Sequence, residues 1–313
     1  MDQKNYYRKN CPDDVPFFSK PLWLDFICPD KWDVVLIMEK DFIKASMPFV
    51  VNNQNKPTKI FMPEHTKFLG PIITNIKEKK ESRLTEEIKC IESLEAKLPV
   101  VETYRQAWSP GYLNSLPFLW RGYKVQIKYC YIIDRNQAIE NAYYALSEDN
   151  RRLIRKAEND GVFILEKNNT EEFFAITNEV FEKQNLKNPY NKNFLIKLAD
   201  FITINKCGKM FFAVNKNNDV SACALVIYDE QETYLFAGGV KHKERISGAN
   251  SLLIWTLIQE SINKGKNFNF LGSIIKSKES YIRSFGGQLH PYLDVIKDNR
   301  SIARLAKRIS KLF

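Results

Sequence analysis

Several features that define common protein classes are scarce in this sequence of 313 residues. Only three histidines occur, so catalysis by a Ser-His or Cys-His pair has few candidates. The six cysteines are scattered and form no C-x-x-C pair. This pattern argues against a metal cage or a disulfide framework, so we expect reduced thiols and no metal site.

Long apolar runs are also missing. No run approaches the roughly 20 residues that a membrane-spanning helix needs. The first residues, MDQKNYYR, lack the apolar core of a signal peptide. We therefore expect a soluble, cytoplasmic protein.

Basic residues, in contrast, are in excess. Lys and Arg number 47 against 37 Asp and Glu, which gives a formal net charge of +10. Such a balance favours anionic partners such as phosphates, nucleotides, nucleic acid or an acidic membrane surface, and it carries no information about the fold.

The length favours two domains, and we place the boundary between residues 146 and 147. In residues 1–146 we expect strands near 33–38, 48–51 and 123–133. Helical spacing of Leu84, Ile88, Ile91 and Leu94 predicts a helix over 82–98.

In residues 147–313 the predicted element order is β-α-α-β-β-β-α-β-α-β. This order indicates an antiparallel meander followed by a helical crossover between parallel strands. The apolar run 233–240 is followed by a charged, glycine-bearing loop, a long helix that ends near Lys264, and a strand over 268–272. Backbone amides at the start of such a helix can bind a phosphate group.

Three segments resemble a known family. RRLIRKAENDG, at 151–161, resembles the interdomain signature R-R-x-I-R-K-A-x-x-x-G, and FNFLGS at 268–273 with YIRSFGG at 281–287 resembles D-F-x-G-S…F-K-x-x-F-G. MPEHTKFLGP, at 62–71, resembles a P-x-T-x-Y-L-G-P stretch of related proteins. In this order, the segments resemble the FemAB-like branch of the GNAT (acyl-CoA N-acyltransferase) superfamily. The resemblance implies an α/β fold of two tandem GNAT-like domains, with mixed, mostly antiparallel central sheets flanked by helices and a degenerate N-terminal domain.

The resemblance also implies a donor site. In GNAT enzymes the pyrophosphate of coenzyme A binds backbone amides of a Q/R-x-x-G-x-G/A loop. The segment Arg245–Asn250 matches its first two anchor positions and departs at the third, where Asn250 replaces a small residue. The implied donor is acetyl-CoA or another acyl-CoA. The implied donor-binding residues are Val240, Arg245, Ser247, Gly248, Ala249, Asn250 and Ser273.

For catalysis the resemblance implies three residues. Arg283 takes the place of a lysine that lies near the reacting carbonyl or a substrate phosphate in Fem ligases. Tyr281 and Tyr292 are candidate general acids toward the leaving group. An acidic residue of the family motif is Asn269 here. The general base stays open among the carboxylates of Asp229, Glu230 and Glu232.

Basic residues predict an anionic acceptor, either a small molecule or a lipid-linked amine. Arg151, Arg152 and Arg155 cluster on one side of a helix, and we add Tyr190 to this acceptor site. The last residues, 300–313, predict an amphipathic basic helix. Such a helix either packs against its own domain or gives peripheral contact with the inner face of a membrane.

From these observations we expect an N-acyltransferase that moves an acyl group, acetyl above all, from acyl-CoA to an amine on an anionic acceptor. Precursors of the cell wall or of surface polysaccharides would fit. Two alternatives stay open. One is an aminoacyl-tRNA-dependent peptidoglycan ligase of the Fem type, with tRNA as a partner. The other is a non-catalytic protein that binds nucleic acid or a membrane surface.

Overall fold

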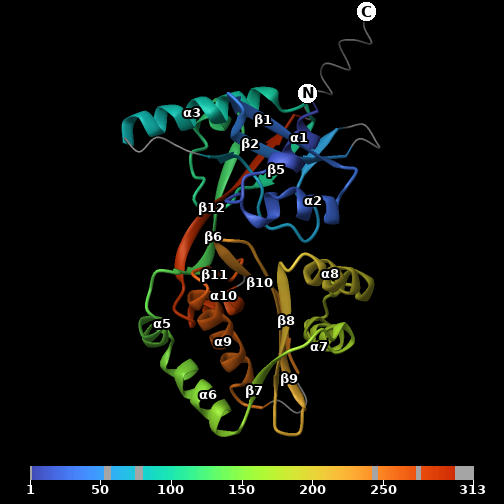
Figure 1. Ribbon diagram of the computed structural model, residues 1–313, viewed down its shortest axis with the longest axis vertical. Helices are drawn as coiled ribbons and strands as arrows, with labels where there is room; N and C mark the ends of the chain where they lie inside the picture. The colour runs from blue at the N-terminus through green and yellow to red at the C-terminus, as the bar shows by residue number, and fades with distance from the viewer. Residues whose placement is uncertain (1, 53–57, 75–79, 242–245, 273–275, 300–313) are drawn as a thin grey trace, which may run out of the picture. The chain divides into compact units, whose positions relative to one another are not determined.

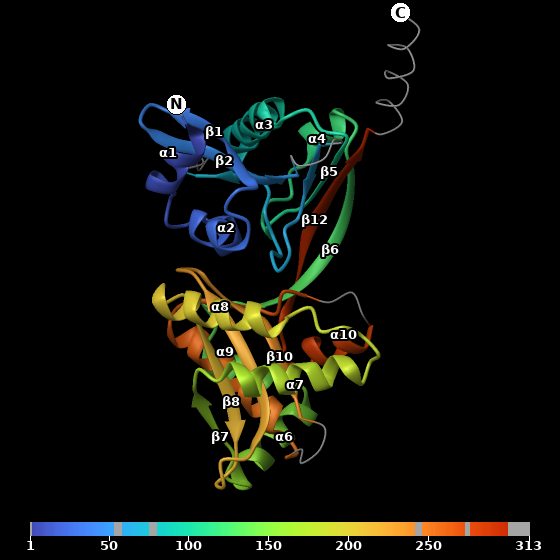
Figure 2. The same cartoon turned by 90° about the vertical axis from the view of Figure 1, so that its right-hand side faces the viewer.

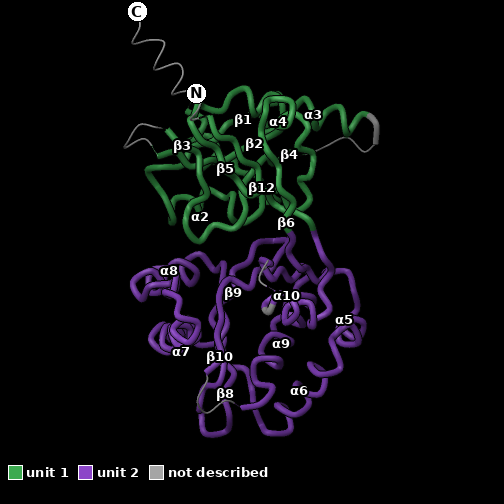
Figure 3. The backbone as a smooth tube through the Cα atoms, turned by 180° about the vertical axis from the view of Figure 1, so that it is seen from behind, with its two compact units in different colours: residues 1–128, 291–313 green, residues 129–290 purple. Residues whose placement is uncertain are grey.

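The computed structural model describes residues 2–52, 58–74, 80–241, 246–272 and 276–299. The chain forms two compact units, one of residues 1–128 and 291–313 and the other of residues 129–290 (Figure 3). This division differs from the expected boundary at 146/147. Strand β6 (Lys124–Ile133) begins in unit 1 and ends in unit 2, and β12 (Gln288–Asp298) returns from unit 2 to unit 1. Unit 1 is therefore completed by chain that is distant in sequence, whereas unit 2 is one continuous segment.

Unit 1 contains a sheet in the order β1-β2-β3-β5-β12, with β4 paired to β2. Strands β3 and β5 are parallel, whereas β1–β2, β2–β3, β2–β4 and β5–β12 are antiparallel. The strands are β1 (Trp32–Glu39), β2 (Phe42–Val51), β3 (Lys59–Phe61), β4 (Ile72–Ile73) and β5 (Thr103–Ala107). The helices are α1 (Gln3–Asn10), a 3₁₀ turn η1 (Phe17–Ser19), α2 (Pro21–Ile27), α3 (Lys80–Lys97) and α4 (Leu116–Trp120).

Helical periodicity places the apolar face of α3 on this sheet. Ile91 and Leu94 are buried with Val35, Met47 and Tyr104 in one core cluster. Leu84, which also fits the helical spacing, is about half exposed, because the apolar contact of α3 is made by its later turns.

Unit 2 contains the order β6-β11-β10-β9-β8-β7. Strands β7 to β10 pair antiparallel, β10 and β11 are parallel, and β11 and β6 are antiparallel. The strands are β7 (Phe163–Glu166), β8 (Gly208–Val214), β9 (Val220–Tyr228), β10 (Glu232–Val240) and β11 (Asn267–Asn269). The helices are α5 (Ile139–Ala145), α6 (Glu148–Asn159), α7 (Thr170–Glu182), α8 (Lys192–Ile204), α9 (Ala249–Asn263) and α10 (Lys276–Arg283). The predicted meander and parallel crossover are both confirmed.

Helices cover both faces of the unit 2 sheet, with α9 on one face and α7 and α8 on the other (Figure 1). Helix α9 is apolar over most of its surface because it packs on the sheet and on α6 at once. Leu253, Trp255 and Ile258 are buried in one core cluster with the small side chains of Ala222 and Ala224 in β9. Within the described ranges, no helix is long and apolar enough to cross a membrane.

Candidate active site

Strands β10 and β11 lie side by side over only three residues each. The pairs are Glu232 with Asn267, Thr233 with Phe268 and Tyr234 with Asn269. Beyond Tyr234, the described residues of β10 pair with β9 alone. The chain after β11 turns away because Leu271 has a φ of 56°, an uncommon value for a bulky side chain. The strands thus part in the way that the predicted donor slot requires, although β11 ends earlier than the expected residue 272.

The part of β10 after Tyr234, which pairs with β9 alone, contains a β-bulge. The register with β9 shifts between Leu235 and Ala237, so Phe236 is an extra residue. Its carbonyl oxygen accepts a hydrogen bond from the Tyr190 hydroxyl at 3.1 Å, and burial raises the pKa of Tyr190 to about 12. Tyr190, predicted to bind the acceptor, therefore holds the backbone of the bulge. Bulges are frequent beside active sites because they redirect a strand.

The first residue before α9 is fixed by a neighbouring helix. Gly248 is the N-cap of α9, with a φ of 86°. A Cβ atom there would lie 2.0 Å from the carbonyl oxygen of Leu153 in α6. The close approach of α6 and α9 therefore explains this glycine without a ligand. The phosphate-binding hypothesis stays a prediction for the start of α9, but it is not needed to explain why residue 248 is glycine.

A polar network joins the ends of three helices beside Gly248. The side-chain amide of Asn250 donates to the Tyr281 hydroxyl on α10. Ser251 donates to the side-chain oxygen of Asn150 on α6 at 2.9 Å, and the amide of Asn150 donates to the hydroxyl of Ser284 at 2.8 Å. Two of the predicted residues, Asn250 and Tyr281, are thus brought together. Asn150 was missed, although it directly precedes the signature segment 151–161.

Arg283 lies at the end of α10 and is largely exposed. Its Nε is 2.9 Å from Oε1 of Glu279, which also accepts a hydrogen bond from the Tyr131 hydroxyl. The hydrogen bonds from Tyr131 and then Arg283 lower the pKa of Glu279. Tyr281 packs edge-on against Phe285 at 5.1 Å, and Phe285 lies 5.8 Å from Phe270, which follows β11. Helix α10 is thereby held against the segment that leaves the parted strands.

Tyr292 has different surroundings from Tyr281. It belongs to unit 1 and is 5% exposed, with its ring 5.1 Å from that of Phe68. Phe68 belongs to the segment 62–71 that carried one of the sequence resemblances. These contacts are those of a core residue, whereas Tyr281 is 40% exposed beside the start of α9.

In the predicted acceptor cluster on α6, Arg151 is bonded within unit 2, whereas Arg152 and Arg155 are exposed. Arg151 donates through Nη1 to the carbonyl oxygens of Tyr144 at 2.8 Å and Leu146 at 2.7 Å, and so caps the end of α5. Arg152 and Arg155 are exposed; Arg152 contacts Asp149 at 3.1 Å. The structure therefore leaves Arg152 and Arg155 accessible to an anion and uses Arg151 within unit 2.

Of the three carboxylates considered as bases, Asp229 and Glu232 have different surroundings. Asp229 accepts the backbone N–H groups of Gln231 and Glu232, both at 2.8 Å, and so shapes the turn before β10. Glu232 accepts from the side-chain amide of Asn269 at 3.0 Å, where the parallel pairing ends. Burial raises the pKa of Glu232 and outweighs this hydrogen bond. A carboxyl group with a raised pKa is suited to accept a proton from an amine.

Some predicted residues lie outside the described part of the chain: Arg245, Ser273 and the C-terminal segment 300–313. Of the other predicted donor-binding residues, Val240 ends β10, Ser247 is exposed, and Ala249 is buried at the start of α9. No group of three metal-binding side chains occurs within the described ranges.

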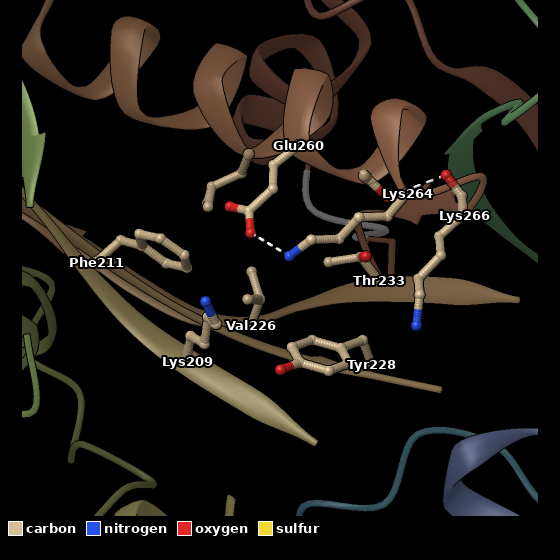
Figure 4. A pocket seen from close by; sticks show the side chains of 10 residues that line it. Lys209, Phe211, Val226, Tyr228, Thr233, Glu260, Lys264 and Lys266 are labelled. Carbon is tan, nitrogen blue, oxygen red and sulfur yellow. Dashed lines mark hydrogen bonds and ion pairs between the residues drawn. The ribbon is translucent and has the colours of Figure 1, made fainter. Parts of the chain in front are cut away.

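A small cavity lies apart from the start of α9, between its C-terminal half and strands β8 to β10 (Figure 4). Its volume is about 20 Å³, and Phe211, Val226 and Leu257 contribute apolar walls. Lys264 contacts Glu260 at its rim. This volume holds about one water molecule, so the cavity is too small for an acyl donor.

Comparison with known proteins is informative at the level of structure. No family model and no curated protein matches the sequence. The solved structure of FemX is similar over 97% of this chain and 97% of that one, with a TM-score of 0.69 and 10% identity. L-PGS from Bacillus licheniformis is similar over 99% and 95%, with a TM-score of 0.54 and 12% identity. A tandem GNAT protein from the clavulanic acid biosynthesis pathway is similar over 95% and 92%, with a TM-score of 0.50 and 8% identity. At these identities the likeness shows the fold, which is the FemAB-like tandem GNAT fold.

Proposed function

We propose that this protein, with its FemAB-like tandem GNAT fold, is an acyltransferase that acylates an amine at the parted strands of unit 2. The observation that supports this proposal is the end of pairing after Tyr234 and Asn269, beyond which β10 continues to Val240, toward the segment that leads into α9. Beyond Tyr234 the described residues of β10 pair with β9 alone, so the side that faced β11 is where we place the donor chain, and the helix start favours negative charge. The acceptor amine would be carried by an anionic molecule such as a cell-wall or surface-polysaccharide precursor.

The chemistry requires no nucleophilic side chain. The neutral amine attacks the acyl carbonyl, a C–N bond forms, and the C–S or C–O bond of the donor breaks. In our proposal Glu232 accepts the amine proton, and Tyr281 gives a proton to the leaving sulfur or oxygen. Arg283 stabilises negative charge on the carbonyl oxygen or a phosphate. The protein otherwise contributes positioning.

Acyl-CoA is the first candidate donor, because the loop and helix start resemble those that hold its pyrophosphate. Asn250 is the residue in conflict with it, since its side chain crosses to Tyr281 at the start of α9. Calorimetry with acetyl-CoA and thiol release with amino-sugar nucleotides test this donor. If CoA is the donor, Asn250→Gly should bind it more tightly than wild type, and Gly265→Ala, at the opposite end of α9, should bind it unchanged.

Aminoacyl-tRNA is the second candidate donor, and two observations favour it. Gly248 is explained by its contact with α6, and the likeness to FemX extends over 97% of both chains. The long helical hairpin that many Fem ligases carry for tRNA is not seen among the described residues of unit 2, where α7 and α8 have 13 residues each.

One experiment separates the candidates. Purified protein is given a precursor with a free amine, together with either acetyl-CoA or charged tRNA, and the product is followed by mass spectrometry. Transfer from only one donor identifies it. Tyr281→Phe should slow the transfer and Tyr292→Phe should not. If neither donor binds or reacts, acyl transfer is refuted and a non-catalytic binding role is favoured.

A further inference from the structure

Helix α4 is a short helix with one buried face and one exposed face. Its Phe118 side chain is fully buried. The Phe118 ring lies 5.0 Å from Trp108, 4.6 Å from Tyr123 and 5.8 Å from Tyr104. This aromatic cluster fixes α4 on unit 1, beside α3 (Figure 2). Because Phe118 packs into this cluster, the opposite face of α4 is directed toward solvent.

The opposite face presents large apolar side chains to solvent. Leu116, Leu119 and Trp120 are related as i, i+3 and i+4, so they share one side of the helix. They are 43%, 44% and 61% exposed, and Leu113, in the preceding loop, is 45% exposed. Single exposed leucines are ordinary, but an exposed patch of four large apolar side chains within eight residues is typical of an interaction site.

The exposed charged side chains described next to this apolar surface are basic, whereas its acidic neighbour Glu95 is buried. From Thr103 to Ile133 the chain has no acidic residue. Arg121, adjacent to Trp120, contacts Glu95 at 2.8 Å, and the side chain of Glu95 is only 8% exposed, against 52% for Arg121. Lys124 is exposed at the start of β6, and Lys297 lies 4.5 Å from the ring of Tyr123. Arg121, Lys124 and Lys297 thus supply positive charge around α4.

We propose that this α4 surface, consisting of Leu113, Leu116, Leu119 and Trp120, docks the protein on an anionic lipid membrane. The three leucines would enter the region between headgroups and acyl chains, and Trp120 would lie at the headgroup level, where its amphipathic ring is favoured. Arg121, Lys124 and Lys297 would face anionic headgroups. This inference is independent of the acyl-transfer proposal.

Other partners fit the surface less well. Single-stranded nucleic acid is held by successive aromatic rings, and leucines offer no stacking surface. A stable contact with a second copy of this chain needs roughly 800 Å² of buried surface on each partner. A single short helix exposes less surface than that. A membrane has no such requirement, because each inserted side chain contributes separately.

Trp120 provides a direct measurement. The other four tryptophans, Trp23, Trp32, Trp108 and Trp255, are at most 5% exposed, whereas Trp120 is 61% exposed. Quenching by acrylamide in solution therefore reports mainly on Trp120. With vesicles that contain phosphatidylglycerol, we expect a blue shift of the emission, protection from acrylamide and quenching by brominated lipid. Vesicles of phosphatidylcholine alone should give much weaker signals, and added salt should weaken binding.

Variants of the full-length protein test the residues. The pair Leu119→Ser and Trp120→Ser should lower vesicle affinity at least tenfold in co-sedimentation, and Lys124→Ala should lower it about fivefold. Trp120→Phe should keep most of the binding and lose the fluorescence signal. The matched control, Leu186→Ser with Ile204→Ser, removes two apolar side chains of unit 2 that are, in that order, more exposed than Leu119 and Trp120, and it should bind like wild type. Circular dichroism verifies that each variant is folded.

Three results would overturn the proposal: no binding to anionic vesicles, vesicle binding in which Trp120 stays accessible to acrylamide, or equal binding by the Leu119/Trp120 double variant and wild type. A dimer in solution that the double variant dissociates, without any vesicle binding, would assign the surface to a second copy instead.

Discussion

Replacement of Gly248 by alanine tests whether helix packing or ligand binding requires a glycine at the start of α9. The added Cβ would lie 2.0 Å from the carbonyl oxygen of Leu153 and 2.8 Å from its carbonyl carbon. Both are backbone atoms in the middle of α6, so no side chain can rotate away. Helices α6 and α9 would have to separate, although Ile154 and Ala157 of α6 are buried with Leu253 of α9 in one core.

The expected cost has two parts. A non-glycine residue in the left-handed region costs about 1 kcal/mol, and relief of a clash in a packed interior costs about 1–3 kcal/mol. Gly248→Ala should therefore lower the free energy of unfolding by about 2–4 kcal/mol. Gly265 is the matched control at the other end of α9: its φ is 65°, and nothing lies within 4 Å of a Cβ placed there. Gly265→Ala should cost only about 1 kcal/mol, the cost of backbone conformation.

Urea denaturation followed by circular dichroism measures both variants. A clear difference between them supports the packing argument. Equal losses would refute it, because the two sites differ in available space and share a left-handed φ. If Gly248→Ala is as stable as wild type but no longer binds a donor, the glycine serves the ligand, and the interpretation given above for residue 248 is wrong.

Three further predictions concern single side chains. Tyr281→Phe should lower kcat about 100-fold or more with little change in the urea midpoint, whereas Tyr292→Phe, enclosed beside Phe68, should leave kcat unchanged; the opposite ranking would remove Tyr281 from the mechanism. Burial alone would raise the pKa of Asp294, but hydrogen bonds from Arg105 and Lys128 outweigh it and the pKa is lowered. The resulting stability is present above the unfolded-state pKa of about 3.9 and is lost as the pH falls through the lower folded-state value. Asp294→Asn should therefore cost about 1–3 kcal/mol at neutral pH, and a cost that stays equally large in acid would contradict the ion-pair explanation. Burial raises the pKa of Glu232, so its stabilising contribution is complete below the unfolded-state pKa of about 4.3 and is lost as the pH rises through the folded-state value. In urea titrations, Glu232→Gln should therefore gain stability relative to wild type as the pH rises from mild acid to neutral. If wild type is instead the more stable protein at neutral pH, the raised pKa is excluded.

Local patterns in the sequence determined the elements of unit 2. The helix after Ser147 begins where that residue caps it, since its side chain accepts from the amide of Asn150. Strands β8 to β10 and the crossover through α9 follow from runs of apolar residues separated by polar turns, which are properties of neighbouring residues. The motif resemblance likewise identified the fold, which the likeness to the FemX structure supports although the overall identity is only 10%.

Contacts between distant residues were decided by the tertiary structure alone. The sequence could not show that β12 completes unit 1, that Arg151 caps α5, or that Leu153 occupies the space beside Gly248. It also could not separate Tyr281 from Tyr292, since both are tyrosines near a glycine pair and only packing buries one of them. Residue type and spacing specify hydrogen bonding and periodicity along the chain. The space around a side chain, its exposure and its pKa depend on which distant segments fold against it, and these are properties of the folded chain only.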